Sequence, residues 1–125
     1  MSNNLTITVE NYWNERLEKV EIFYHNSDLP NNNAFVFFDL ESRQSSTTVD
    51  SGVFPLSTRG ESSWKARIST ESGTVWSSGD FLLCQINPDD NNTVTISFDG
   101  NFENMTVYYP SSSSCSKKME LSKKN

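Results

Sequence analysis

The stretch Ser62–Gly100, SSWKARISTESGTVWSSGDFLLCQINPDDNNTVTISFDG, decides the fold class. Apolar and polar residues alternate in Trp64–Ser69 and again in Thr93–Phe98. Turn-forming residues at 71–74 and 87–92 separate these segments from the apolar run between them. Alternation with a period of two, interrupted by turn residues, is typical of antiparallel strands with one solvated face.

The rest of the chain repeats this pattern. Leu5–Val9, Val20–Tyr24 and Met105–Tyr109 alternate in the same way, and Asp99-Gly100 is a hairpin turn signal. We expect about eight to ten short strands and predict an all-β fold, a single-domain antiparallel β-sandwich. The predicted domain covers residues 1–116, and residues 117–125 form a basic tail that we expect to lack fixed structure.

The alternation also predicts the core. We expect these side chains to be buried: Trp64, Ile68, Phe81, Leu83, Val94, Ile96, Val107 and either Phe35 or Phe38. The segment Ala34–Leu40 (AFVFFDL) is apolar on both faces of its predicted strand. Such a strand is either covered on both faces or forms an interface with its outer face.

The charge pattern argues against nucleic acid as a partner. Residues 1–116 hold fifteen acids and six bases, whereas the last nine residues hold four lysines and one glutamate. Nucleic-acid binding needs Lys and Arg on the folded surface, so an acidic body disfavours it.

The N-terminal segment MSNNLTITVEN has no basic start and no apolar core, so it does not resemble a signal peptide. No apolar run has the length of a transmembrane helix. We expect a cytoplasmic protein, with release by a route that needs no signal as the other option. In that compartment Cys84 and Cys115 are expected to be free thiols.

Catalytic and metal-binding signals are weak. His25 is the single histidine, so a catalytic triad or a His/Cys zinc site has no support. Asn87–Asn92 (NPDDNN) offers oxygen ligands for a weak cation site, but it also has the composition of an ordinary turn. We predict that the protein is not an enzyme and uses no cofactor or metal.

Four aromatic residues are the best candidates for ligand contacts: Tyr12, Trp13, Trp76 and Tyr108. Tyr and Trp at the exposed ends of strands suit stacking on sugars or insertion among lipid headgroups. The alternative is that Trp13 and Trp76 cover the ends of the core. Adjacent residues of a strand point to opposite faces, so one of Tyr108 and Tyr109 is expected outside.

The pattern of about residues 5–116 resembles that of the aegerolysins and related small β-sandwich proteins of fungi and nematodes. The segments that carry the resemblance are LTITVEN, SSWKARI, GTVWSSGDFLLCQI and NTVTISFDGNFENMTVYYPSSSSC. The resemblance lies in pattern rather than in matched motifs, so it assigns no binding residue. It implies a protein that recognises lipid headgroups, sometimes together with a pore-forming partner.

Three functions follow from these observations. The first is a binding module that recognises a glycan or a neutral or zwitterionic lipid headgroup through loop aromatics, since an acidic body disfavours anionic ligands. The second is an abundant self-associating or structural protein with an aromatic homodimer interface. A small hydrolase is the third.

Overall fold

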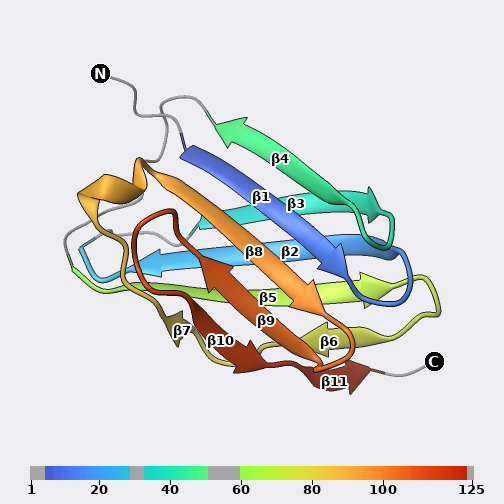
Figure 1. The fold of residues 1–125 in the computed structure, drawn as a ribbon. Coiled ribbons are helices and arrows are strands. Elements are labelled where there is room, and N and C mark those ends of the chain that lie inside the picture. The colour runs from blue at the N-terminus through green and yellow to red at the C-terminus, as the bar shows by residue number, and fades with distance from the viewer. Residues whose placement is uncertain (1–4, 29–32, 51–59, 124–125) are drawn as a thin grey trace.

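The computed structural model describes residues 5–28, 33–50 and 60–123. It consists almost entirely of strands, which form two sheets packed face to face (Figure 1). The all-β sandwich predicted from the sequence is therefore confirmed. The described residues form eleven strands, one more than the upper number expected.

The front sheet contains five strands in the order β10 (Cys115–Lys118), β9 (Asn104–Tyr108), β8 (Thr93–Asp99), β1 (Leu5–Tyr12) and β4 (Ser45–Asp50). Its pairs are antiparallel except for β1 and β8, which run parallel although about eighty residues separate them.

The back sheet has the order β11 (Glu120–Lys123), β6 (Val75–Ser77), β5 (Ser62–Thr70), β2 (Leu17–Asn26) and β3 (Asn33–Leu40), with the short β7 (Leu82–Leu83) beside β5. One 3₁₀ turn, η1 (Pro88–Asp90), precedes β8.

The core lies between the sheets, and alternation selects its residues. Along β2 the side chains are buried and partly exposed in turn from Val20 to Asn26. The predicted core residues that are buried are Trp64, Ile68, Val94, Ile96 and Val107. Trp64 of β5 points from the back sheet into the core between the sheets. Its indole Nε1 donates a hydrogen bond of 2.7 Å to the hydroxyl of Tyr109.

The core prediction needs correction at Leu83 and Phe81, whereas of the two alternatives Phe35 and Phe38 it is Phe35 that packs against the core. Leu83 is 55% exposed because β7 is only two residues long and presents Leu83 to solvent, and Phe81 before it is only partly buried. On β3, Phe37 is buried and Phe35 packs against the core, whereas Phe38 is 67% exposed. The outer face of β3 is thus apolar and exposed.

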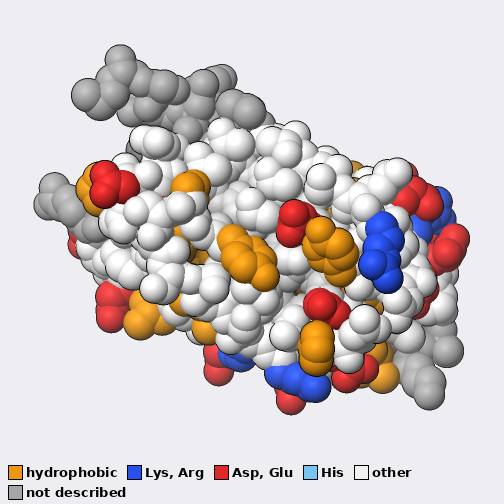
Figure 2. Space-filling view, viewed as in Figure 1, with side chains coloured by type: hydrophobic (Ala, Val, Ile, Leu, Met, Phe, Trp, Pro, Cys, Tyr) orange, Lys and Arg blue, Asp and Glu red, His pale blue; other side chains and the backbone are white. Residues whose placement is uncertain are grey.

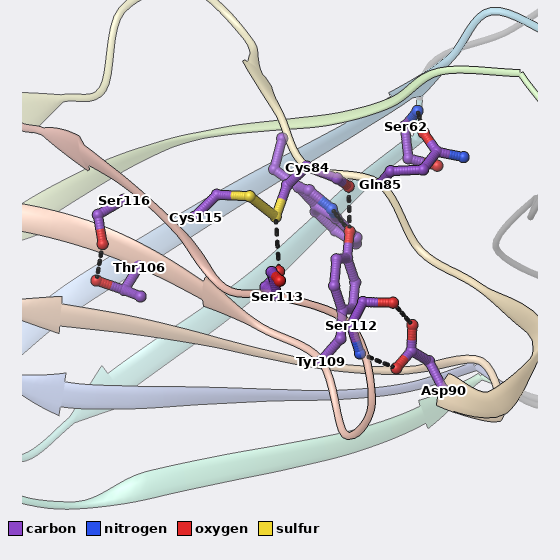
Figure 3. The surroundings of a disulfide bond; sticks show 11 residues. Ser62, Cys84, Gln85, Asp90, Thr106, Tyr109, Ser112, Ser113, Cys115 and Ser116 are labelled. Atoms are coloured by element: carbon purple, nitrogen blue, oxygen red, sulfur yellow. Dashed lines mark hydrogen bonds between the residues drawn. A yellow bond between two sulfur atoms is a disulfide. The ribbon is translucent and has the colours of Figure 1, made fainter.

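The two cysteines form a disulfide, so the prediction of free thiols is wrong. Cys84 follows β7, and Cys115 begins β10 on the front sheet, which brings their Cα atoms to 5.9 Å (Figure 3). The bond therefore links the two layers at one end of the sandwich. Disulfides persist mainly in oxidising compartments, so this bond weighs against a cytoplasmic location, which stays a prediction.

The C-terminal segment is also ordered differently from the prediction. Residues 115–118 and 120–123 form β10 and β11, and Met119 between them is 1% exposed. Because β10 extends the front sheet and β11 extends the back sheet, the buried methionine anchors the crossing between them. The boundary predicted at residue 116 is wrong, and the strands continue to residue 123.

The segment Asn87–Asn92 forms a turn rather than an open loop of oxygen ligands. Asp90 is fully buried and accepts hydrogen bonds from the backbone N–H groups of Asn87 and Ser111. It also accepts hydrogen bonds from the backbone N–H and the hydroxyl of Ser112 (Figure 3). Burial by itself raises the pKa of Asp90, but these hydrogen bonds outweigh it and lower the pKa below its usual value. The carboxylate thus joins η1 to the segment that precedes β10.

Candidate ligand-binding face of the front sheet

The four predicted aromatics separate into two pairs. Tyr12 and Tyr108 are 43% and 46% exposed, and both point outward from the front sheet. Trp13 is only 6% exposed and packs edge-to-face against Trp76, with ring centroids 5.3 Å apart. Trp76 is partly buried against the core. The prediction that Trp13 and Trp76 contact a ligand is therefore not supported by their placement.

Strand alternation explains this division. Ile7 and Val9 of β1 point into the core, so Tyr12 points outward and Trp13 inward. The Asn11 side chain accepts a hydrogen bond of 2.8 Å from the Trp13 N–H and fixes the turn that follows. Gly100 allows the β8–β9 turn to lie close to the Trp13 backbone, because an added Cβ at residue 100 would lie only 3.1 Å from the Trp13 Cα.

Three neighbouring strands bring outward-facing polar side chains into rows. In one row Tyr12 lies beside Asp99, and Asp99 lies beside Asn104. The next two rows are Glu10, Ser97 and Thr106, followed by Thr8, Thr95 and Tyr108. The two tyrosines thus occupy opposite corners of a surface made of hydroxyl, amide and carboxylate groups.

This surface forms an open groove of about 490 Å³, which we call the tyrosine groove. Its lining residues are Glu10, Tyr12, Ser97, Asp99, Phe102, Asn104, Thr106 and Tyr108. Phe102, in the β8–β9 turn, is 68% exposed. Figure 2 shows hydrophobic side chains with acidic side chains between them on the face formed by β1, β8 and β9.

The size of the groove can be worked out from the strand pairing. Tyr12 and Tyr108 are two strands and four residues apart. With neighbouring strands ~4.8 Å apart and a rise of ~3.4 Å per residue, their Cα atoms are separated by roughly 17 Å. A ligand that touches both rings must therefore be extended.

The groove is electrostatically negative. Glu10 and Asp99 contribute carboxylates, and Asp99 Oδ1 accepts hydrogen bonds from the N–H groups of Asn101 and Phe102, which fix the turn at one end. At the margin, Lys118 Nζ donates to the Phe102 carbonyl at 3.2 Å and lies 3.9 Å from the Glu103 carboxylate. The Lys118 ammonium is thus bound to the Phe102 carbonyl and near the Glu103 carboxylate. With Glu10 and Asp99 in the groove, the surface disfavours anionic ligands.

A smaller hollow of about 290 Å³ lies on the back sheet beside Phe23, Lys65 and Phe81. The Lys65 ammonium lies 5.6 Å from the ring centroid of Phe23 and 4.7 Å from that of Phe81. This hollow contains none of the four predicted aromatics, and a lysine already covers its rings.

The single histidine and the candidate metal ligands give no further site beside the groove in the part of the chain that the structure describes. His25 lies on β2 of the other sheet, with its ring centroid 5.5 Å from that of Phe81. Within residues 5–28, 33–50 and 60–123, no group of three or more His, Cys, Asp or Glu side chains could hold a metal ion. In the same ranges no helix has the length and hydrophobicity to cross a membrane.

Sequence reasoning missed most of the groove. None of the polar residues Glu10, Asp99, Asn104 and Thr106, nor the turn residue Phe102, was predicted as a ligand contact. Alternation identifies the outer face of each strand, so these positions could have been sorted by face. What the sequence did not reveal is that β1 and β8 are parallel neighbours.

Comparison with known proteins gives no further assignment. No known protein family matches the chain, and no curated protein matches it either. The resemblance to the aegerolysins therefore stays a prediction.

Proposed function

We propose that the protein is a binding module that holds a neutral, extended glycan in the tyrosine groove. The observation that carries the proposal is the presence of two exposed tyrosines in one groove, separated by side chains that donate and accept hydrogen bonds. Aromatic rings cover the apolar faces of sugar rings, while a few polar groups fix the orientation of the hydroxyls.

The spacing favours a glycan over a lipid headgroup. With their Cα atoms roughly 17 Å apart, Tyr12 and Tyr108 suit a chain of several sugar rings. A single zwitterionic headgroup would contact one tyrosine and leave the other unused. The carboxylates of Glu10 and Asp99 accept hydrogen bonds from sugar hydroxyls and repel sulfated or carboxylated sugars.

The test is a screen of neutral and acidic oligosaccharides, followed by calorimetric titration of the best ligand. Tyr12→Ala and Tyr108→Ala are each expected to weaken binding about tenfold, which corresponds to about 1.4 kcal/mol. Leu83→Ala is the matched control, because Leu83 is exposed and lies outside the groove. This control should bind like the parent.

Binding to vesicles of phosphatidylcholine tests the alternative hypothesis, that the ligand is a zwitterionic lipid headgroup. Binding to these vesicles without binding to any neutral oligosaccharide would overturn the proposal in favour of the headgroup hypothesis. Loss of affinity in Leu83→Ala, or unchanged affinity in both tyrosine variants, would show that the ligand binds elsewhere.

A further inference from the structure

Strand β3 ends the back sheet and exposes an apolar outer face. Among the described residues β3 pairs only with β2, so within them its other backbone edge has no strand partner. Ala34, Val36 and Phe38 point outward from it, with Val36 44% and Phe38 67% exposed. The exposed apolar side chains of β3 therefore lie on the same strand as the backbone edge that has no partner among the described residues.

Over Ala34–Phe38 this edge lacks the usual protection against pairing. Natural edge strands carry lysine, proline or inward-pointing charges that prevent contact with another strand. The segment Ala34–Phe38 contains no charge and no proline, and its inward residues Phe35 and Phe37 are also apolar. Only Asp39, with a φ of 54°, interrupts the strand, and beyond it Leu40 returns to the core.

We propose that β3 pairs antiparallel with β3 of a second copy of this chain, about a two-fold axis at Val36. In this register Val36 faces Val36 of the second copy, and Ala34 faces Phe38 of the second copy. The pairing continues the back sheet from one copy into the other. A two-fold contact of this kind closes after two copies and leaves no further β3 edge free.

Size complementarity supports a second copy as the occupant. The small side chain of Ala34 leaves room for the phenyl ring of Phe38 from the other copy. Phe23 is the cross-strand neighbour of Ala34 on β2, so that ring also meets an aromatic surface. The same strand thus supplies both the large residue and the space that receives it.

The charges beside the strand are also compatible with self-pairing. Glu21 is the β2 neighbour of Val36, and its carboxylate lies 3.0 Å from Arg67 and 3.9 Å from Lys19. Its charge is therefore compensated within one copy. Across the proposed axis the two glutamates are separated by both Val36 residues, so no like charges face each other directly.

The contact involves a single strand from each copy and belongs to the small, weak class of interfaces. We expect a monomer–dimer equilibrium that shifts on dilution. The tyrosine groove lies on the front sheet, so glycan binding and dimerisation are independent properties and can fail separately.

Sedimentation equilibrium over a range of concentrations tests the association. The parent should shift from monomer to dimer as concentration rises, and Phe38→Lys should remain monomeric with an unchanged melting temperature. Leu83→Lys is the matched control, because it places the same charge at an exposed apolar site away from β3. This control should dimerise like the parent.

Cross-linking tests the register. Val36→Cys should form a disulfide between copies under mild oxidation, whereas Phe38→Cys should not, because its partner in this register is Ala34. A parent that is monomeric at every concentration, a dimer that survives Phe38→Lys, or cross-linking of Phe38→Cys in preference to Val36→Cys would each overturn the proposal.

Discussion

Breaking the bond between Cys84 and Cys115 should lower the free energy of unfolding by about 3.7 kcal/mol. The two cysteines are 31 residues apart in the sequence, and the bond restricts the unfolded chain by closing this loop. The loop-entropy relation gives about −12 cal/mol/K for this length, which amounts to about 3.7 kcal/mol at 25 °C.

The expected loss in melting temperature follows from the size of the chain. A chain of 125 residues has an unfolding entropy of about 260 cal/mol/K near its midpoint, since each residue contributes about 2.1 cal/mol/K. Division of the two quantities predicts a decrease of roughly 14 °C. Because β10 and β11 continue from Cys115, we expect this C-terminal segment to lose protection against hydrogen exchange first.

The assay compares thermal unfolding of the parent, the parent with a reducing agent, and the Cys84→Ala/Cys115→Ala double variant. Mass spectrometry of the alkylated protein verifies the state of the thiols in each sample. The double variant also removes a buried thiol, so its melting temperature should lie slightly below that of the reduced parent. Loop closure predicts a difference of roughly 14 °C between the oxidised and the fully reduced parent. A difference within about 2 °C would show that the disulfide does not stabilise the fold in this way.

Three further changes test the remaining structure, each by thermal unfolding. Tyr109→Phe should cost about 1–3 kcal/mol, because it leaves the buried Trp64 indole N–H and the Cys84 carbonyl without their common partner; a variant as stable as the parent would contradict these hydrogen bonds. Asp90 has a lowered pKa, so its contribution to stability is present above the pKa of an unfolded aspartate and is lost as the pH falls through the lower folded-state pKa. Asp90→Asn should therefore destabilise the protein at neutral pH and flatten this part of its acid titration, whereas an unchanged titration would argue against the four hydrogen bonds. Trp13→Ala should lower the free energy of unfolding by about 3–5 kcal/mol, as expected for a large core side chain. A variant that unfolds at the same temperature as the parent would show that Trp13 is not part of the core.

The candidate site was half predictable from the sequence. Tyr12 and Tyr108 were named because Tyr and Trp at the exposed ends of strands suit ligand contacts, and both are exposed on the front sheet. Trp13 continues the inward parity of Ile7 and Val9, but it follows the last residue of β1, so the sequence left both an exposed and a core placement open. Trp76 packs on Trp13 and is partly buried against the core, which agrees with the alternative that the two tryptophans cover the ends of the core.

The disulfide and the C-terminal strands illustrate a different limit. Nothing near Cys115 in its serine-rich segment predicts a partner 31 residues away. Likewise, the four lysines near the C-terminus suggest a solvated tail, although Met119 among them is buried. These contacts depend on which strand lies beside which, and local composition contains no information about that.

The sequence alone was enough to predict the fold class, the alternating faces of the main strands, and the buried aliphatic residues Ile68, Val94, Ile96 and Val107. A period of two is a property of the extended backbone, so it can be recognised before any pairing is known. The parallel pairing of β1 with β8 and the position of β3 at a sheet edge could be seen only in the structure, because strand pairing joins segments far apart in the chain. The β1–β8 pairing forms the tyrosine groove on the front sheet, and the edge position of β3 exposes its apolar face on the back sheet.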